Sequence, residues 1–387
     1  LYTTGENPFN MMLFDATGDG AEDLLYLNSD GKQVLAMREQ VGEREFGPES
    51  RYVLERPARI IVPLEQVGDE AATLGVVESR TGTIEFMRLH AGKNDEKEVK
   101  SALEYGAPEI YPIFKKVRES ASYAPGDVDG DGEDDLIVAN PTGAELVLFM
   151  KKDGRFQASE AFPSFSQVSS LSVGRFYADT QEHIIVVSEA EKTIGRSVLD
   201  DAGRLSFPRQ LQIGSGDPAV TAAIDLNGDG FDELLLVNES KGSYSLIAAA
   251  PANRSEVDGT WDVLVEMELP NVRRKPTAIS ELGLFKSGQP GLMLFVPREP
   301  PVLLRPTHKE DGLSFESLAS ESSIRESLLK ALEPAETSFF DVDGDGLNEM
   351  IVARTGFSRA FRVVGDGLEM VDQFNARRGS DVIDAVI

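Results

Sequence analysis

The sequence has no cysteine, one tryptophan, three histidines and no long apolar run. Without cysteine, no disulfide bond supports the fold. No stretch of about 18 apolar residues is present, so we expect no membrane-spanning helix. Basic residues are also few, with 38 lysines and arginines against 66 aspartates and glutamates and a net charge of −28. A chain this acidic repels phosphate backbones and anionic lipids, so we expect no nucleic-acid partner and no membrane insertion.

The sequence also lacks the short motifs of common enzyme classes. It contains no GxSxG nucleophile elbow, no HExxH zinc motif and no Walker-type phosphate loop. None of the histidines, at positions 90, 183 and 308, shares a local motif with another ligand or base. His183 falls where the last ligand of a degenerate metal loop would lie, and we interpret it as a relic or a surface residue. These absences favour a non-catalytic protein.

A nine-residue acidic phrase occurs four times, at 15–23, 127–135, 225–233 and 341–349, each time directly before an apolar strand. Oxygen-bearing side chains stand at positions one, three, five and nine, and glycines at positions four and six permit a sharp turn. This arrangement is typical of a site for a hard cation. Calcium accepts six to eight oxygens with flexible geometry, whereas magnesium requires a strict octahedron and keeps its water, so we predict calcium.

The predicted ligands are the side chains at positions one, three, five and nine and the backbone carbonyl at position seven. They are Asp15, Thr17, Asp19, Ala21 and Asp23; Asp127, Asp129, Asp131, Glu133 and Asp135; Asp225, Asn227, Asp229, Phe231 and Glu233; and Asp341, Asp343, Asp345, Leu347 and Glu349. We expect up to four structural calcium ions. The first site should be the weakest, because Thr17 replaces a charged ligand.

An EF-hand is excluded by spacing, because its loop has twelve residues and ends in a bidentate glutamate. The twelfth position here is Tyr26, Val138, Leu236 or Val352, none of which can ligate a metal. The phrase D-x-[DN]-G-D-G-x-x-[DE] followed by an apolar strand instead resembles the FG-GAP/VCBS repeat of integrin α-chain heads and of many bacterial secreted proteins. The resemblance implies a β-propeller with calcium in the loop between the first two strands of a blade.

The strands after the four loops begin at Leu24, Leu136, Leu234 and Met350, about two propeller blades apart. Midway strands that lack the loop begin at Leu74, Ile184 and Leu292. Turns containing Asp-Gly indicate hairpins between the later strands of each repeat. We therefore predict an all-β chain in which residues 1–387 form a single seven-bladed β-propeller with four-stranded antiparallel blades.

Three further segments carry structural expectations. Residues 380–387 resemble the strand that precedes a calcium loop, so an eight-bladed ring stays open. Residues 322–333, stopped by Pro334, predict a short helix with one apolar face. The charged run 90–100 predicts an extended surface loop.

Turns between second and third strands carry basic residues on an otherwise acidic chain, namely Arg80, Lys241, Arg298 and Arg354. We predict that this face, opposite the calcium loops, receives a partner.

The leading hypothesis is a non-catalytic, calcium-stabilised module that binds a protein or a glycan. The alternative is a carbohydrate-active enzyme or enzyme subunit, similar to lyase- or dehydratase-type propellers. Because calcium loops of modest affinity suit millimolar external calcium, we expect a secreted, periplasmic or cell-surface location. The chain begins at Leu1 without a signal-peptide pattern, and we interpret it as a mature or excised segment.

Overall fold

The computed structural model describes much of the chain, with gaps that fall mainly in loops and in the second repeat. The described residues are 8–28, 34–42, 45–54, 58, 60–64, 73–78, 83–88, 109–112, 122–140, 143–152, 155–157, 160–285, 290–309, 312–318, 329–341, 347–354, 357–365 and 367–375.

These residues form seven four-stranded sheets, which we call blades 1 to 7 in chain order. Blades 1 to 4 consist of β1 (Pro8–Phe14), β2 (Asp23–Asn28), β3 (Val34–Arg38) and β6 (Ser50–Val53); β7 (Ile60–Leu64), β8 (Thr73–Glu78), β9 (Thr83–Arg88) and β10 (Glu109–Pro112); β11 (Tyr123–Gly126), β12 (Asp135–Ala139), β13 (Glu145–Phe149) and β16 (Glu160–Pro163); and β17 (Val168–Gly174), β18 (His183–Ser188), β19 (Thr193–Ser197) and β20 (Arg209–Gln210).

Blades 5 to 7 consist of β21 (Asp217–Ile224), β22 (Glu233–Ser240), β23 (Ser243–Pro251) and β24 (Trp261–Glu268); β25 (Ala278–Leu282), β26 (Gly291–Phe295), β27 (Val302–Lys309) and β28 (Gly312–Ser317); and β29 (Thr337–Phe340), β30 (Glu349–Arg354), β31 (Phe357–Val364) and β32 (Gly367–Asn375). Two small hairpins are added, β4 (Gln40–Gly42) with β5 (Glu45–Phe46) and β14 (Lys151–Lys152) with β15 (Arg155–Phe156).

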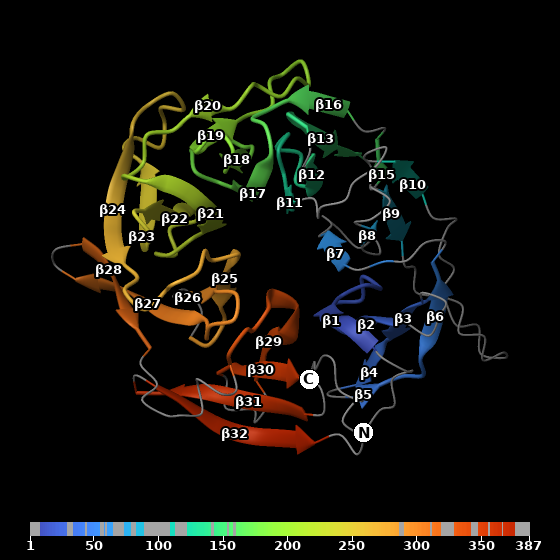
Figure 1. The fold of residues 1–387 in the computed structure, drawn as a ribbon. Coiled ribbons are helices and arrows are strands. Elements are labelled where there is room, and N and C mark those ends of the chain that lie inside the picture. The colour runs from blue at the N-terminus through green and yellow to red at the C-terminus, as the bar shows by residue number, and fades with distance from the viewer. Residues whose placement is uncertain are drawn as a thin grey trace.

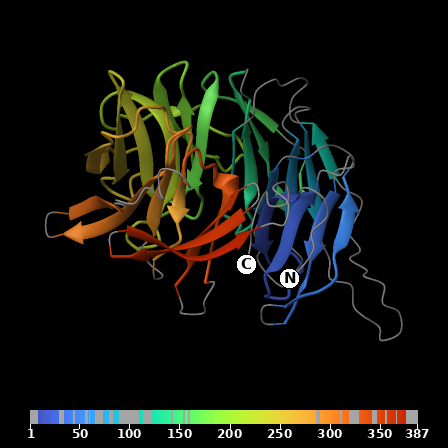
Figure 2. The same ribbon diagram turned by 60° about the horizontal axis from the view of Figure 1, so that its bottom comes forward.

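The sheets follow one another around a ring, as the change from blue to red in Figure 1 shows. The first strand of each blade faces the centre and the fourth lies at the rim (Figure 1). First strands of successive blades contact each other directly, for example β11 with β17 and β17 with β21. Figure 2 shows that the strands run between the two faces of the disk.

All strand pairs within the blades are antiparallel, so alternate connections emerge on opposite faces of the disk. The first-to-second and third-to-fourth connections share one face, which we call the acidic-loop face. The second-to-third turns and the links between blades share the other, which we call the opposite face.

The second strands are buried over most of their length because neighbouring blades cover both of their sides. Every residue of β12 and β18 is buried, whereas the residues of the rim strand β24 are all exposed or half-buried. The hydrophobic clusters span neighbouring blades, as in the group that joins Leu235 and Leu246 of blade 5 to Leu292 and Leu304 of blade 6. The core is therefore a series of interfaces between blades.

Two of these interfaces use the same polar contact at the acidic-loop face. The Glu182 carboxylate accepts a hydrogen bond from Asp127 N (3.1 Å), and Glu182 N donates to Asp127 O (2.8 Å). One blade further on, the Asp232 carboxylate accepts from Arg175 N (2.7 Å), and Asp232 N donates to Arg175 O (2.9 Å). Each loop is thus held by the eighth loop residue of the next blade.

Glycines at the ends of β11 and β17 allow this close approach. A Cβ on Gly126 would lie 2.5 Å from the Glu182 carboxylate, and one on Gly174 would lie 2.7 Å from the Asp232 carboxylate. Both positions therefore require a residue without a side chain.

The predictions of an all-β chain and of four-stranded antiparallel propeller blades are confirmed. The seven predicted strand starts all lie in the second strand of a blade. No eighth four-stranded sheet is formed by the residues that the structure describes. Residues 90–100, 322–328 and 380–387 lie outside those residues. Residues 329–333, the end of the predicted helix, form a turn instead, and Pro334–Glu336 form a 3-10 helix, η1. No helix in the described ranges has the length and hydropathy to cross a membrane.

Candidate metal centres

The second acidic loop, 127–135, is wound around the side chain of its first residue. Asp127 accepts hydrogen bonds from the backbone amides of Gly130 (2.7 Å), Asp131 (3.0 Å) and Gly132 (2.9 Å). The two glycines have φ of 78° and 88°, in the left-handed region that side chains disfavour. The glycines thus turn the loop so that the remaining carboxylates converge.

Three carboxylates of this loop form the one group in the described part of the chain with metal-ligand geometry. One oxygen from each of Asp127, Asp129 and Asp135 lies within 4.8 Å of the others. Burial, with a smaller contribution from the charges of Asp129 and Asp131, raises the pKa of Asp135 to about 8. Burial likewise raises the pKa of Asp129. Crowded, desolvated carboxylates fit a divalent cation, which would favour their charged forms.

The carboxylate at position nine is buried in all four loops. Asp23, Asp135 and Glu349 are fully buried and Glu233 is 1 % exposed. The position-two amide donates to it at 3.2 Å in the first two loops and at 3.0 Å in the third. In the first two loops an amide just beyond the third strand also donates, at 3.0 Å to Asp23 and 2.8 Å to Asp135. This carboxylate therefore ties the loop to the sheet.

The first loop, 15–23, has the same framework but less charge. Asp15 accepts hydrogen bonds from Gly18 N (2.7 Å) and Gly20 N (2.9 Å), and Asp19 accepts one from Ala21 N (2.9 Å). Burial raises the pKa of Asp23 to about 6. The carboxylates of this loop do not form a close group of three. The weaker affinity expected here stays a prediction.

In the third loop, 225–233, an arginine approaches the predicted ligands. Arg254, from the turn between β23 and β24, lies 2.7 Å from Glu233 and 3.7 Å from Asp229. Its guanidinium also donates to Asp232 O (3.1 Å) and Phe176 O (3.2 Å) and lies 5.0 Å above the Phe231 ring. The loop therefore already contains a cation supplied by the chain.

Blade 4 has a degenerate loop, 175–182, and the structure corrects the surface interpretation of His183. That side chain is fully buried. Its Nε2 lies 2.9 Å from Asp179 Oδ2, its Nδ1 lies 2.8 Å from Arg196 Nη1, and its ring lies 4.8 Å from that of Tyr177. Burial lowers the pKa of His183. A histidine–arginine–aspartate network thus fills the place where the other loops present acidic ligands.

The fourth loop is described only at its ends, through Asp341, Leu347 and Glu349. Asp343 and Asp345 lie outside the described residues. Sequence reasoning missed Arg254 and Arg196, because each acts on a loop 13 or more residues away and belongs to no local motif.

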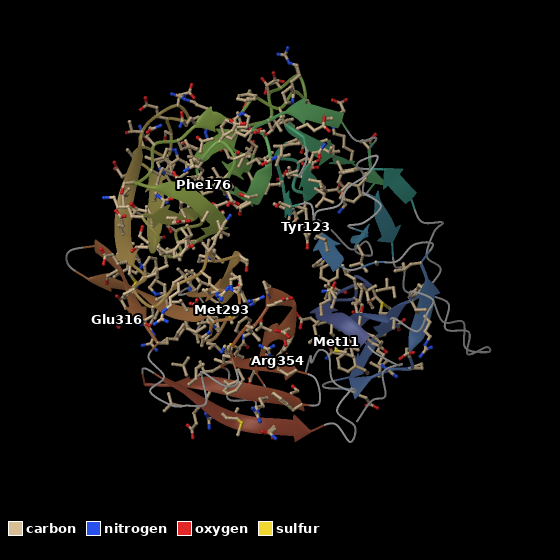
Figure 3. All side chains as sticks on the ribbon, in the orientation of Figure 1. Met11, Tyr123, Phe176, Met293, Glu316 and Arg354 are labelled. Carbon is tan, nitrogen blue, oxygen red and sulfur yellow. The ribbon has the colours of Figure 1, made fainter. Side chains whose placement is uncertain are left out.

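The four predicted partner-binding positions have different surroundings. Lys241 and Arg298 are exposed, in turns on the opposite face. Arg354 is half-buried, lies 3.1 Å from Glu336 and donates to Lys330 O (2.9 Å). Figure 3 places Arg354 in blade 7, well inside the rim position of Glu316. Arg80 lies outside the described residues.

Together, the fold and the loops define a β-propeller whose blades carry acidic loops between their first two strands. Residues 121–154, which include β11, the second loop and β13, match the family model of the FG-GAP repeat. The resemblance expected from the sequence is therefore confirmed, and the chain is a β-propeller with an FG-GAP repeat.

Among solved structures, this chain matches a functionally unknown protein from Desulfotomaculum acetoxidans DSM 771. It is 11% identical, with a TM-score of 0.49, and the match covers 89% of this chain and 97% of that chain. No curated protein matches the sequence.

Proposed function

We propose that this protein is a calcium-stabilised β-propeller that acts outside the cytoplasm as a non-catalytic binding or structural module for a protein or a glycan. The observation that carries the proposal is the group formed by Asp127, Asp129 and Asp135, in which one oxygen of each lies within 4.8 Å of the others. The Asp135 side chain is fully buried. Hard oxygen ligands in a flexible loop suit calcium better than other common divalent ions.

The ion's role would be structural. In the second loop, Asp127, Asp129, Asp131 and Asp135 would hold it together with the carbonyl of Glu133. A bound cation would supply positive charge beside carboxylates that link the first three strands of the blade. This protein-rich ligand set leaves little space for a substrate, which supports a stabilising rather than a catalytic ion.

The proposed location follows from the ion. Loops of this kind with modest affinity fill at millimolar calcium, the concentration found outside cells. The match to the FG-GAP repeat agrees with this location, since the resemblance is to integrin heads and secreted bacterial proteins.

Neither of the two cavities described in the structure favours the enzyme alternative. One lies on the opposite face and the other lies beside Asp129 and Lys152 on the acidic-loop face. No histidine or tyrosine is among the described lining residues of either cavity, and the carboxylates of the second cavity include Asp129, a predicted metal ligand. A rigid ring that displays loops on two faces is better suited to binding.

We further propose that the seven blades form the complete ring. The 3-10 helix η1 of blade 7 lies against β1 of blade 1, which brings the last blade beside the first.

The test is a binding screen of the intact protein against arrays of glycans and of surface proteins, in calcium and in EGTA. We expect at least one ligand whose binding weakens in EGTA as the propeller loosens. The absence of calcium binding by calorimetry would overturn the metal part of the proposal. Turnover of an arrayed glycan would replace the binding role with the enzyme alternative.

A further inference from the structure

A cleft of about 1000 Å³ lies on the opposite face, where blades 5, 6 and 7 meet. Its walls come from three links of the chain. Asn271–Arg274 connect β24 to β25, Arg298–Val302 connect β26 to β27, and Ser317 and Lys330 flank the connection from β28 to blade 7. This volume is at the upper end of the range for small-molecule sites and accommodates several residues of a peptide.

The lining is strongly basic, although the whole chain has a net charge of −28. Among the described residues that line the cleft, Arg273, Arg274, Arg298 and Lys330 stand against one carboxylate, that of Glu299. All four basic residues are exposed. Arg274 lies 3.9 Å from Glu299, and no ion pair is recorded for the other three within the described ranges.

Glu299, the carboxylate among the described lining residues, connects the links that form the cleft. Glu299 accepts a hydrogen bond from Arg273 N (3.1 Å) through its side chain and one from Ala331 N (2.9 Å) through its carbonyl. Its amide donates to Val296 O (3.1 Å). These contacts hold the three links in fixed positions relative to one another. The basic side chains therefore project from loops that are hydrogen-bonded together rather than from independent loops.

The walls between the charges are apolar but not aromatic. Val272 and Pro301 are buried, and Pro300 and Val302 are half-buried. None of the lining residues that the structure describes is aromatic, so none offers a ring on which a sugar could stack. Arginine forks pair with carboxylates in two-point hydrogen bonds, and proline and valine surfaces suit small aliphatic side chains.

The charge of the rest of the molecule limits the length of the ligand. A long polyanionic chain would extend beyond the cleft, where the net charge of −28 of the whole molecule repels it. A short segment with a few carboxylates would keep its charge within the basic lining. This difference favours an acidic peptide over a sulfated or uronate-rich polysaccharide.

We propose that the cleft binds an acidic peptide segment of a partner protein, with carboxylates on Arg273, Arg298 and Lys330 and aliphatic side chains against the proline and valine walls. The inference rests on the proposed binding role and narrows its ligand to one chemical class.

The test uses the full chain in calcium and a fluorescein-labelled octapeptide of alternating glutamate and valine, measured by fluorescence polarisation. Its glutamine counterpart and a sulfated octasaccharide are run alongside. We expect the acidic peptide to bind best, and Arg298→Glu to weaken it about tenfold or more. Lys192→Glu is the matched control, because Lys192 and Arg298 are both exposed, lie in second-to-third-strand turns and have φ of 52° and 63°.

Equal binding by Arg298→Glu and wild type, or preference for the octasaccharide, would overturn the cleft proposal. A ligand from the array screen that binds Arg298→Glu as tightly as wild type would do the same while leaving the general binding role intact. Circular dichroism of both variants separates loss of binding from loss of folding.

Discussion

At the scale of single residues, the position-nine carboxylates pose an energetic problem. Each is buried, and burial penalises the charged form. Three backbone amides donate to this side chain in the first loop and two in the second, and in the third loop Arg254 pairs with it. Neutral donors only partly replace water around a charge. In the first two loops we therefore expect a bound cation beside this carboxylate, in addition to the backbone amides.

Asp129→Asn tests the second loop. The asparagine keeps an oxygen ligand but removes one charge from the group that it forms with Asp127 and Asp135. We expect calcium affinity at this site to fall about tenfold, or roughly 1.4 kcal/mol. Isothermal titration calorimetry measures the loss. Asp201→Asn, at an exposed acidic residue on the same face, is the control and should leave affinity unchanged.

His183 gives a pH prediction. Its pKa in the folded protein lies below the ordinary value of 6.5, mainly because of burial. The unfolded chain therefore binds this proton more readily, so the stability contribution is complete above pH 6.5 and is lost as the pH falls below it. Urea unfolding at two pH values should show a smaller loss between pH 7.5 and 5.5 for His183→Gln than for wild type. An unchanged pH dependence would contradict the assignment.

At the scale of elements, the loop between the first two strands of a blade has three different arrangements of charge. The second loop presents three converging carboxylates, the third receives Arg254, and the degenerate loop of blade 4 has the His183–Arg196 pair. In blades 4 and 5 an arginine side chain supplies the positive charge, so these blades need not depend on a metal as much as blade 3 does. The four loops should therefore differ in their metal dependence.

Arg254→Met separates the two kinds of cation in blade 5. Without the guanidinium, the buried Glu233 loses its charged partner, and we expect the metal-free protein to lose roughly 2 kcal/mol. Calcium should restore more stability in this variant than in wild type, because the third loop becomes more accessible to the ion. Chemical denaturation in EGTA and in calcium measures both values. Arg204→Met, at an exposed arginine paired with Asp200, should change neither by more than about 0.5 kcal/mol.

The contact between neighbouring blades makes a second prediction at this scale. Gly174→Ala would place a Cβ 2.5 Å from Ala223 Cβ and 2.7 Å from the Asp232 carboxylate. Because blades 4 and 5 must separate to admit it, we expect a loss of about 1–3 kcal/mol. Thermal unfolding should show a lower Tm. Gly42→Ala, whose Cβ would approach nothing nearer than 3.8 Å, is the control; equal Tm values for the two variants would contradict the close-contact argument.

At the scale of the whole molecule, periodicity was enough to predict the blades. Second strands are apolar on both sides, so Leu74, Ile184 and Leu292 were recognised even where the acidic loop is absent. Contacts between blades could not be predicted, because they join residues about 50 positions apart with no shared motif, as in Glu182 with Asp127. The basic cleft escaped detection for the same reason. The sequence alone points to Arg298 as a basic turn residue. Arg273 and Lys330 line the same cleft only because the blades are arranged in a ring.

The net charge of −28 and the acidic loops make metal removal a test of the entire ring. Chelation by EGTA should lower the Tm, because calcium at 100 times its dissociation constant stabilises by about 2.7 kcal/mol per site. We expect calcium to have two effects: it would fill the loops, and its charge would reduce repulsion among carboxylates across the molecule. Sodium chloride at matched ionic strength supplies only the screening. We therefore expect calcium to restore the full Tm, magnesium to restore part of it and sodium to restore least. Full recovery in sodium chloride would show that charge screening, rather than bound metal, holds the blades together.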